Sequence, residues 1–382
     1  MRHTNKILLL STGILFFIDS LCQDRDTSLP NLIPYRKGDL WGYCDKNKNL
    51  ILPAKYSWAE PFIAGRAIVH FDDKKHGVID SLGKELLTIG KDTMITIWSN
   101  GSVLIEKKFV DIIFVLQKDG SVFRSKKYKL KFPFDENSYV AAKGKKWGVI
   151  DNKENVIIPF KFKVVSEIDD KGYIMVTNKD GKRGFINKEG RFIIPYFKQG
   201  IIIGGFDDDR ALIGIGEQFK ETWGYMDRTG KTVIPLQYKK AEGFIDGLAI
   251  AGNDKLAGII DLNGDTILPF KFTSLQWLSN KMYSFSDSLR SGIIKISGEE
   301  LFTTRRGSCC SSVAGVFFVY DVANWEGNAF KMRYKVIDKN GNEAFPEKFG
   351  VFFPAGPGLI SVTDDDGKSY YMDFNRNKYY ED

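Results

Sequence analysis

The stretch Trp223–Pro235 reads WGYMDRTGKTVIP, and two other stretches of the chain follow the same pattern. Trp41–Pro53 reads WGYCDKNKNLILP, and Trp147–Pro159 reads WGVIDNKENVIIP. Each stretch begins with Trp-Gly, places an Asp three residues after the Gly, passes through a turn-forming segment and ends an apolar run at Pro. Self-similarity of this kind indicates a tandem array of one structural unit, here of roughly 36 residues.

Weaker copies of the pattern extend the array over most of the chain. In several of them the Gly is kept but the preceding Trp is replaced, as in His76-Gly77, Arg183-Gly184 and Ala257-Gly258. The pattern is most degenerate within residues 90–140 and 290–382. Counting these copies, we expect a repeat array of about ten units over residues 35–382.

Each unit is predicted to be a meander of β-strands. In the copy quoted first, the strand that carries Trp-Gly turns back at Gly230, which is free to adopt a positive φ. The return strand Thr232–Ile234 is expected to end at Pro235, because proline cannot donate to a strand ladder. An irregular stretch, Leu236–Phe244, then leads to a third strand at Leu248–Ala251. The chain is therefore expected to be all-β, as either a propeller-like toroid or an open β-superhelix.

The recurrent residues of the unit are expected to be structural. A Trp at one fixed position is suited to packing between neighbouring units, and a Gly beside it would let another backbone approach closely. The recurrent Asp is expected to close a turn by accepting hydrogen bonds from backbone N–H groups. The residues to which we assign this packing role are Trp41, Gly42, Trp147, Gly148, Trp223 and Gly224.

These motifs resemble the WG-repeat family (WG containing repeat), which is widespread in bacterial proteins of the cell envelope and exterior. The resemblance covers nearly all of the chain after its N-terminal segment. It implies a bacterial protein built from a repeated β-unit that is used for interaction. It implies no particular activity, because the family shares none that can be assigned to residues of this chain.

The N-terminus is typical of a secretion signal. Arg2 and Lys6 precede the apolar run Ile7–Ile18, and Ser20-Leu21-Cys22 forms a cleavage site before Gln23. We therefore expect a signal peptide at residues 1–22, a short linker at residues 23–34, and an exported mature chain in the periplasm, on the outer surface or secreted. A lipid on Cys22 or a retained anchor is the alternative. No run of 18 apolar residues follows this segment, so we expect no membrane span in the mature chain.

The cysteines and histidines predict no catalytic, cofactor or metal residue. Cys44 occupies an apolar position of the repeat and is expected to be a small buried hydrophobe. The Cys309-Cys310 pair is either two loop thiols or a pair with a redox or intermolecular role. His70 and His76 have no third metal ligand nearby in the sequence. No catalytic motif is found, and the acidic run Asp207–Asp209 is expected to be a solvated turn.

One segment is strongly basic. Residues 107–146 carry eleven Lys or Arg against four Asp or Glu, an excess equal to the net charge of +7 of the whole chain. Within it, Lys127, Lys129 and Lys131 alternate with Tyr128, Leu130 and Phe132, so a strand would place the three lysines on one face. This stripe is either a protected edge strand or a surface for an acidic partner, such as an acidic protein face or an anionic glycan.

The sequence thus favours a non-enzymatic scaffold, secreted or associated with the envelope, that binds a protein or glycan partner and needs no cofactor. Nucleic acid is not an expected partner. Two other hypotheses stay open: a carbohydrate-active enzyme with a site at the centre of the repeat array, and a structural component of an envelope assembly. Converging carboxylates from several copies would favour the enzyme, and a broad apolar or basic face would favour the scaffold.

Overall fold

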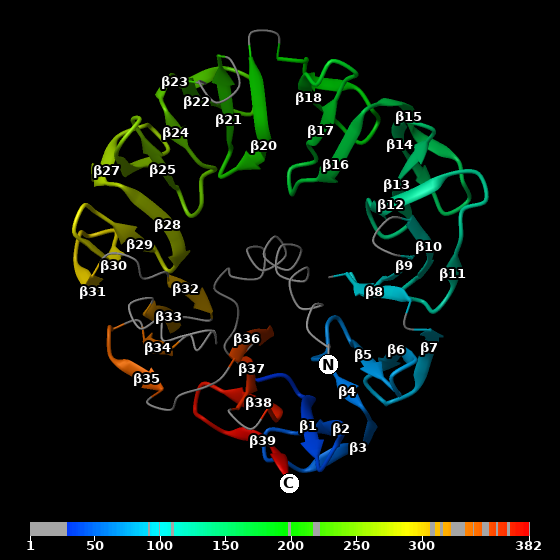
Figure 1. Cartoon of the computed structure of the whole chain (residues 1–382). Helices are drawn as coiled ribbons and strands as arrows, with labels where there is room; N and C mark the ends of the chain where they lie inside the picture. Colours follow the sequence, from blue (N-terminus) through cyan, green and yellow to red (C-terminus); the bar gives the residue numbers. More distant parts are fainter. Residues whose placement is uncertain are drawn as a thin grey trace, which may run out of the picture. The chain divides into compact units, whose positions relative to one another are not determined.

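The computed structural model describes residues 29–90, 92–98, 100–107, 111–197, 200–216, 222–305, 310–313, 316–321, 333–338, 340–345, 351–356, 358–364 and 367–381. Over these residues the regular structure consists of β-strands, with no helix, which confirms the predicted all-β class. The strands assemble into successive sheets, most of them with four strands (Figure 1). The signal segment, residues 23–28 of the expected linker and Cys309 lie outside the described residues.

One compact unit covers Phe62–Lys271 and contains six successive sheets. Its strands are β5 (Arg66–His70), β6 (Lys75–Asp80) and β7 (Glu85–Gly90); β8 (Thr93–Ile97), β9 (Val103–Lys107), β10 (Asp111–Leu116) and β11 (Val122–Phe123); β12 (Lys129–Pro133), β13 (Ser138–Lys143), β14 (Lys146–Asp151) and β15 (Val156–Phe162); β16 (Val164–Ile168), β17 (Ile174–Thr177), β18 (Arg183–Ile186) and β19 (Phe192–Ile194); β20 (Ile201–Asp207), β21 (Arg210–Ile215), β22 (Thr222–Met226) and β23 (Thr232–Tyr238); and β24 (Lys240–Ala241), β25 (Leu248–Gly252), β26 (Ala257–Asp261) and β27 (Thr266–Phe272). Side by side in space, these strands follow their order in the sequence, as in the meander of a propeller blade.

The other compact unit combines the two ends of the chain, residues up to Pro61 and from Phe272 onward. Its strands are β1 (Ile33–Lys37), β2 (Leu40–Cys44), β3 (Leu50–Tyr56) and β4 (Trp58–Ala59); β28 (Ser274–Ser279), β29 (Met282–Ser286), β30 (Arg290–Lys295) and β31 (Glu300–Arg305); β32 (Cys310–Val313), β33 (Val316–Asp321), β34 (Arg333–Asp338) and β35 (Glu343–Phe345); and β36 (Val351–Gly356), β37 (Leu359–Thr363), β38 (Ser369–Asp373) and β39 (Lys378–Glu381).

Within this unit, β39 joins the first and last copies of the repeat. It pairs antiparallel with β38 and parallel with β1, with Arg36 opposite Tyr380 and Lys37 opposite Glu381. The resulting sheet has seven strands in the order β3-β2-β1-β39-β38-β37-β36. The first copy contributes only the three strands β1–β3 to this sheet. β39 lies next to β1, in the place that the first strand occupies in the four-stranded sheets.

The sequence repeat is out of phase with the sheets. The copy that begins at Trp223 contributes β22 and β23 to one sheet and β24 and β25 to the next. Each copy of the repeat therefore contributes strands to two neighbouring sheets. The chain passes from one sheet to the next in the middle of the repeat. The pattern of glycines and turns did not reveal this phase.

The prediction that Pro235 ends its strand was wrong. β23 continues through Pro235 to Tyr238, and β3 and β15 continue through Pro53 and Pro159 in the same way. The register shows the reason: Tyr225 pairs with Ile234 and Trp223 with Tyr238, so the residues between form a bulge opposite Gly224. In a bulge of an outermost strand, a proline interrupts no ladder hydrogen bond.

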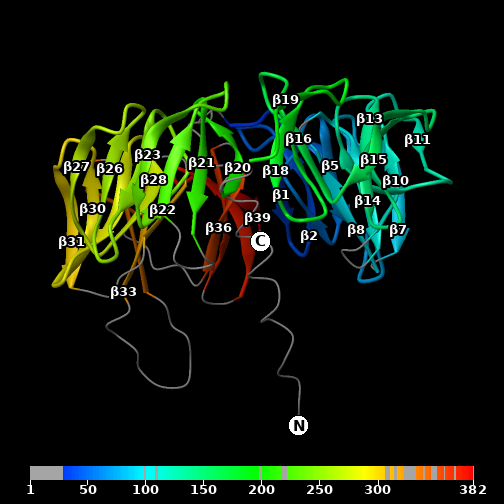
Figure 2. The same ribbon diagram turned by 90° about the horizontal axis from the view of Figure 1, so that it is seen from above.

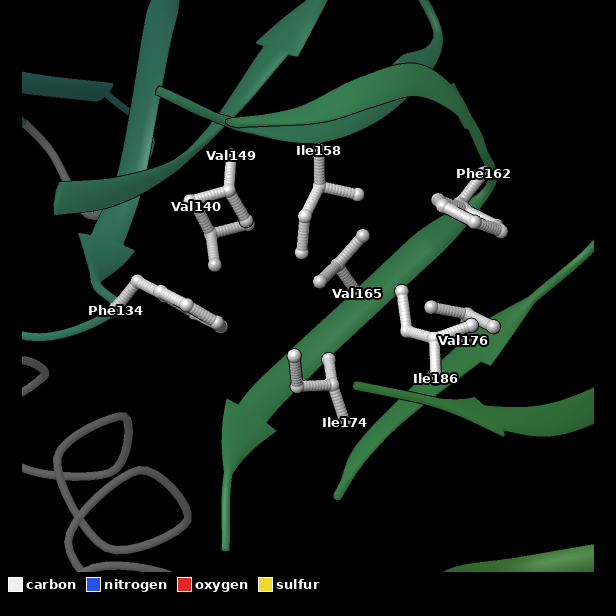
Figure 3. Packing of buried hydrophobic residues seen from close by; sticks show 9 residues of the cluster. All are labelled: Phe134, Val140, Val149, Ile158, Phe162, Val165, Ile174, Val176 and Ile186. Carbon is white, nitrogen blue, oxygen red and sulfur yellow. The ribbon is translucent and has the colours of Figure 1, made fainter. Parts of the chain in front are cut away.

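Neighbouring sheets pack face to face through apolar side chains. Figure 3 shows one such core, in which Val140, Val149 and Ile158 of one sheet meet Val165 and Ile174 of the next. All five side chains are fully buried. Alternate residues of each strand supply these contacts, as the two-residue period of a strand requires.

Candidate functional site

The Trp residues of the repeat lie between elements and are not free binding platforms. Trp41 is 3% exposed, and its ring lies 4.7 Å from that of Trp58 and 5.6 Å from that of Tyr371. Trp147 and Trp223 are half-buried, and each packs against the apolar core between two neighbouring sheets.

The Gly after each Trp leaves no room for a side chain. A Cβ atom on Gly224 would lie 2.5 Å from the carbonyl oxygen of Ile234 and 2.7 Å from that of Pro235. Cβ atoms on Gly42 and Gly148 would meet the carbonyl oxygens of Leu52 and Ile158 in the same way. The bulged outer strand thus crosses directly over the glycine in all three copies.

The recurrent Asp closes the turn between the third and fourth strands, as predicted. In the turn after β22, Asp227 accepts hydrogen bonds from the backbone N–H groups of Thr229 (2.9 Å) and Lys231 (3.1 Å). The same two bonds, to the second and fourth residues after the Asp, occur at Asp45, Asp80, Asp151, Asp261 and Asp338. One carboxylate oxygen, Oδ1, therefore holds the turn, and side chains beside it such as Lys231 remain exposed.

The structure separates the three lysines of the basic stripe. Lys127 precedes the strand and lies 3.6 Å from the carboxylate of Glu154. Lys129 is exposed at the start of β12, whereas Lys131 is half-buried with its Nζ 5.5 Å from the centre of the Trp147 ring. A register shift between Leu130 and Phe132 interrupts the alternation. β12 is the first strand of its sheet, but its lysines do not form one continuous stripe.

Two arginines make long-range contacts that the sequence did not predict. Arg66 is 6% exposed and donates to the carbonyl oxygens of Gly101 (2.7 Å), Leu116 (3.3 Å), Gln117 (2.9 Å) and Lys118 (3.1 Å). It thereby ties the start of β5 to two turns of the following sheet. Because its partners lie 35 to 52 residues away, no local pattern marks it.

Arg228 is the second. Its guanidinium carbon lies 4.8 Å from the centre of the Tyr173 ring and 4.7 Å from that of Phe206, and the guanidinium binds the carboxylates of Asp169 (2.7 Å) and Asp209 (2.6 Å). Asp207–Asp209 does lie at a turn, but the expectation that the run is merely solvated was wrong for Asp209. Hydrogen bonds from Lys171, which has the larger effect, and from Arg228 hold the pKa of Asp209 below its usual range.

Glu60 is an acidic group in an apolar setting at the end of β4. It is half-buried, its carbonyl oxygen accepts a hydrogen bond from the Tyr43 hydroxyl (2.8 Å), and the Tyr371 hydroxyl donates to the neighbouring carbonyl of Ala59 (3.2 Å). Burial raises the pKa of the Glu60 carboxyl from 4.5 to about 7. A carboxyl group in this position exchanges its proton near neutral pH.

We expect Glu60→Gln to stabilise the protein at high pH and to leave it nearly unchanged at low pH. The pKa is raised on folding, so the favourable contribution of this group is complete below pH 4.5 and is lost as pH rises through 7. At pH 8 the variant should gain about 2 kcal/mol in the free energy of unfolding, measured by urea titration at pH 4 and pH 8. Glu136→Gln is the control, because the Glu136 side chain is exposed in the turn between β12 and β13. Equal gains at both pH values would contradict the assignment.

The remaining polar candidates provide no assembled centre among the described residues. His70 and His76 face each other across β5 and β6 with ring centres 5.5 Å apart, and burial lowers both pKa values. No group of three His, Cys, Asp or Glu side chains in the described part of the chain is placed to hold a metal ion. Cys44 is fully buried, as predicted, and burial raises the pKa of its thiol to about 12. No helix long and apolar enough to cross a membrane occurs in the described ranges.

Comparison with known proteins supports the repeat and the fold. The family model described as WG containing repeat matches residues 41–74, 147–182 and 223–256, each starting at a Trp-Gly pair. No curated protein matches the chain significantly. A crystal structure of the eukaryotic initiation factor is similar with a TM-score of 0.51 and 11% identity over 84% of this chain and 97% of that one, which supports a shared fold alone.

Two other solved structures have lower scores. Hsv2p of Kluyveromyces lactis has a TM-score of 0.38 at 8% identity, over 65% of this chain and 94% of that one. BamB from Moraxella catarrhalis has a TM-score of 0.37 at 11% identity, over 82% of this chain and 95% of that one. The chain therefore contains three matched copies of the WG-type repeat, and its described residues form a tandem array of mostly four-stranded β-sheets.

Proposed function

We propose that this protein is an exported, non-enzymatic β-repeat scaffold of the bacterial envelope or exterior that binds a protein or glycan partner. The observation that carries the proposal is the repeated turn. In most copies an Asp fixes the backbone, as at Asp151 and Asp227, while neighbouring charged side chains such as Lys153 and Lys231 stay exposed. Rigid turns with exposed charges form a preorganised surface, which lowers the entropic cost of binding.

Export is part of the proposal and rests on the N-terminal sequence. The charged start, the apolar run Ile7–Ile18 and the small residues before Gln23 are those of a cleaved signal. Binding also fits the architecture, because stacked repeats form an extended surface for a partner and need no single catalytic residue.

The test uses the protein recovered from producing cells. Its intact mass should correspond to a chain that begins at Gln23, without Met1 and without lipid on Cys22. The recovered protein is then mixed with soluble envelope glycans, and both binding and glycan chain length are followed. We expect a partner to be bound and every glycan to keep its length. Shortening of a glycan by substoichiometric protein would instead establish the carbohydrate-active enzyme, and a lipid mass would overturn the export route.

A further inference from the structure

A row of exposed lysines lies along one edge of two neighbouring sheets. In an antiparallel meander, the turn between the second and third strands and the end of the fourth strand lie at the same edge. β15 and β16 are separated only by Lys163, so this edge continues from the sheet β12–β15 to the sheet β16–β19; Figure 2 shows these strands from the side. The exposed lysines at this edge, which we call the basic row, are Lys143, Lys145, Lys146, Lys161, Lys163, Lys179 and Lys182.

The strand registers show that the row is continuous. Lys143 stands directly opposite Lys146. The next pair along, Trp147 with Phe162, brings Lys146 beside Lys163. The backbone N–H of Lys163 donates to the carbonyl oxygen of Thr177 (2.8 Å), the residue at which the second sheet enters its turn with Lys179 and Lys182. Along the row, three lysines lie at the β13–β14 turn, two at the junction of β15 and β16, and two at the β17–β18 turn, which also holds Asp180.

The fold gains little from this arrangement beyond the contact of Lys161, whose Nζ lies 5.2 Å from the centre of the Phe162 ring. Like charges directly opposite on paired strands repel, as Lys143 and Lys146 do. Among the described residues, no carboxylate lies within ion-pair distance of the ammonium groups of the row. The adjacent Arg183 is used internally, since its guanidinium donates to the carbonyl oxygen of Ile202 (2.6 Å). The uncompensated charge therefore faces solvent and any anion there.

We propose that the basic row binds an anionic polysaccharide, a polymer with one acidic group on successive sugars. This inference rests on the proposed scaffold function and names its partner class. A line of point charges on flexible stems matches a polymer with regularly spaced carboxylates or sulfates, and it needs no fixed fork geometry because the row contains lysine and not arginine.

The other polyanions fit less well. An acidic protein would be anchored by aromatic or large apolar side chains at the centre of the interface, but the exposed apolar residue beside the row is Val164, at 36%. Single-stranded nucleic acid would need exposed aromatic rings for base stacking. The aromatic residues nearest the row do not provide a free ring: Phe162 is 1% exposed and Phe160 is stacked on Tyr128 at 4.7 Å. Trp147 is half-buried, packs against the core and has the Lys131 ammonium over its ring.

The test measures binding of fluorescent alginate, a polyuronate, to the full chain at low and at physiological salt. One variant carries Lys143→Gln, Lys146→Gln, Lys163→Gln and Lys182→Gln. The matched control removes the same charge from exposed lysines on two other sheets, β4–β7 and β24–β27: Lys74→Gln, Lys75→Gln, Lys240→Gln and Lys255→Gln. We expect the row variant to bind about tenfold more weakly at low salt and with a smaller salt dependence, and the control to stay within about twofold of the unmodified protein.

A second measurement uses the unmodified protein: bound alginate should protect the row lysines, but not the control lysines, from acetylation. Equal losses in both variants would show an effect of net charge and overturn the row. Tighter binding of poly-glutamate or duplex DNA than of alginate would overturn the polysaccharide. If a neutral dextran or a protein binds and alginate does not, the basic row is not a polysaccharide-binding site, whereas the proposed scaffold function is retained. If alginate is shortened, the non-enzymatic function itself fails.

Discussion

Gly224→Ala should lower the free energy of unfolding by about 3 kcal/mol or more. The new methyl group would stand 2.5 Å from the carbonyl oxygen of Ile234 and 2.7 Å from that of Pro235, and both oxygens belong to backbone. Backbone cannot rotate out of the way as the end of a side chain can, so β23 must move away from β22 and lose its bulge register. Urea-induced unfolding followed by tryptophan fluorescence measures the loss.

Gly205→Ala is the matched control, because Gly205 belongs to β20 of the same sheet. No atom lies within 4 Å of a Cβ placed there, and its φ is not in the left-handed region. This change should alter the free energy of unfolding by no more than about 0.5 kcal/mol. Gly120, in a degenerate copy, would be a poor comparison, since its φ of +87° strains any side chain. Equal, small effects at Gly224 and Gly205 would show that the Gly of the repeat is not a packing requirement.

Arg66→Met should also cost about 3 kcal/mol. Methionine keeps much of the apolar stem but leaves the carbonyl groups at Gly101 and Leu116–Lys118 without their charged donor. Lysine at the same position should recover only part of the loss, because one ammonium group cannot reach carbonyls that the planar guanidinium bridges. The three proteins are compared by urea titration.

Arg210 provides the internal control for this prediction. It begins β21 as Arg66 begins β5, yet among the described residues its guanidinium reaches one carbonyl oxygen of the following sheet, that of Leu262, at 3.2 Å. Arg210→Met should therefore cost about 1 kcal/mol or less. A loss at Arg210 as large as that at Arg66 would mean that the number of bridged carbonyls does not set the energy.

The local features of the repeat could be predicted from the sequence. Strand alternation, the positive φ of Gly230 and the turn-closing role of Asp227 depend on residues within a few positions of each other. A pattern of this kind is readable because neighbouring residues determine it. The error at Pro235 had the same origin: the rule that proline ends a strand is local, whereas the bulge that accommodates it depends on Gly224 in the paired strand.

The features that join one sheet to the next could not be predicted. Arg228 reaches Asp169 across 59 residues, and the raised pKa of Glu60 depends on burial by surrounding elements. The basic row was visible only in part, since Lys143, Lys145 and Lys146 fall in the basic segment but are joined to Lys163 and Lys182 by register alone. The sequence instead drew attention to Lys127, Lys129 and Lys131, whose alternation the structure interrupts.

The double pairing of β39 has a consequence for how the chain is made. Arg36 and Tyr380 are neighbours in one ladder although almost the whole chain separates them. Closing so long a loop costs entropy that no local contact repays, and contacts this distant in sequence form slowly. During synthesis the first copy of the repeat emerges early, but β1 lacks this partner strand until β39 has been made. A stop codon at Lys378 would therefore leave both the first and the last sheet of the repeat array without this shared strand.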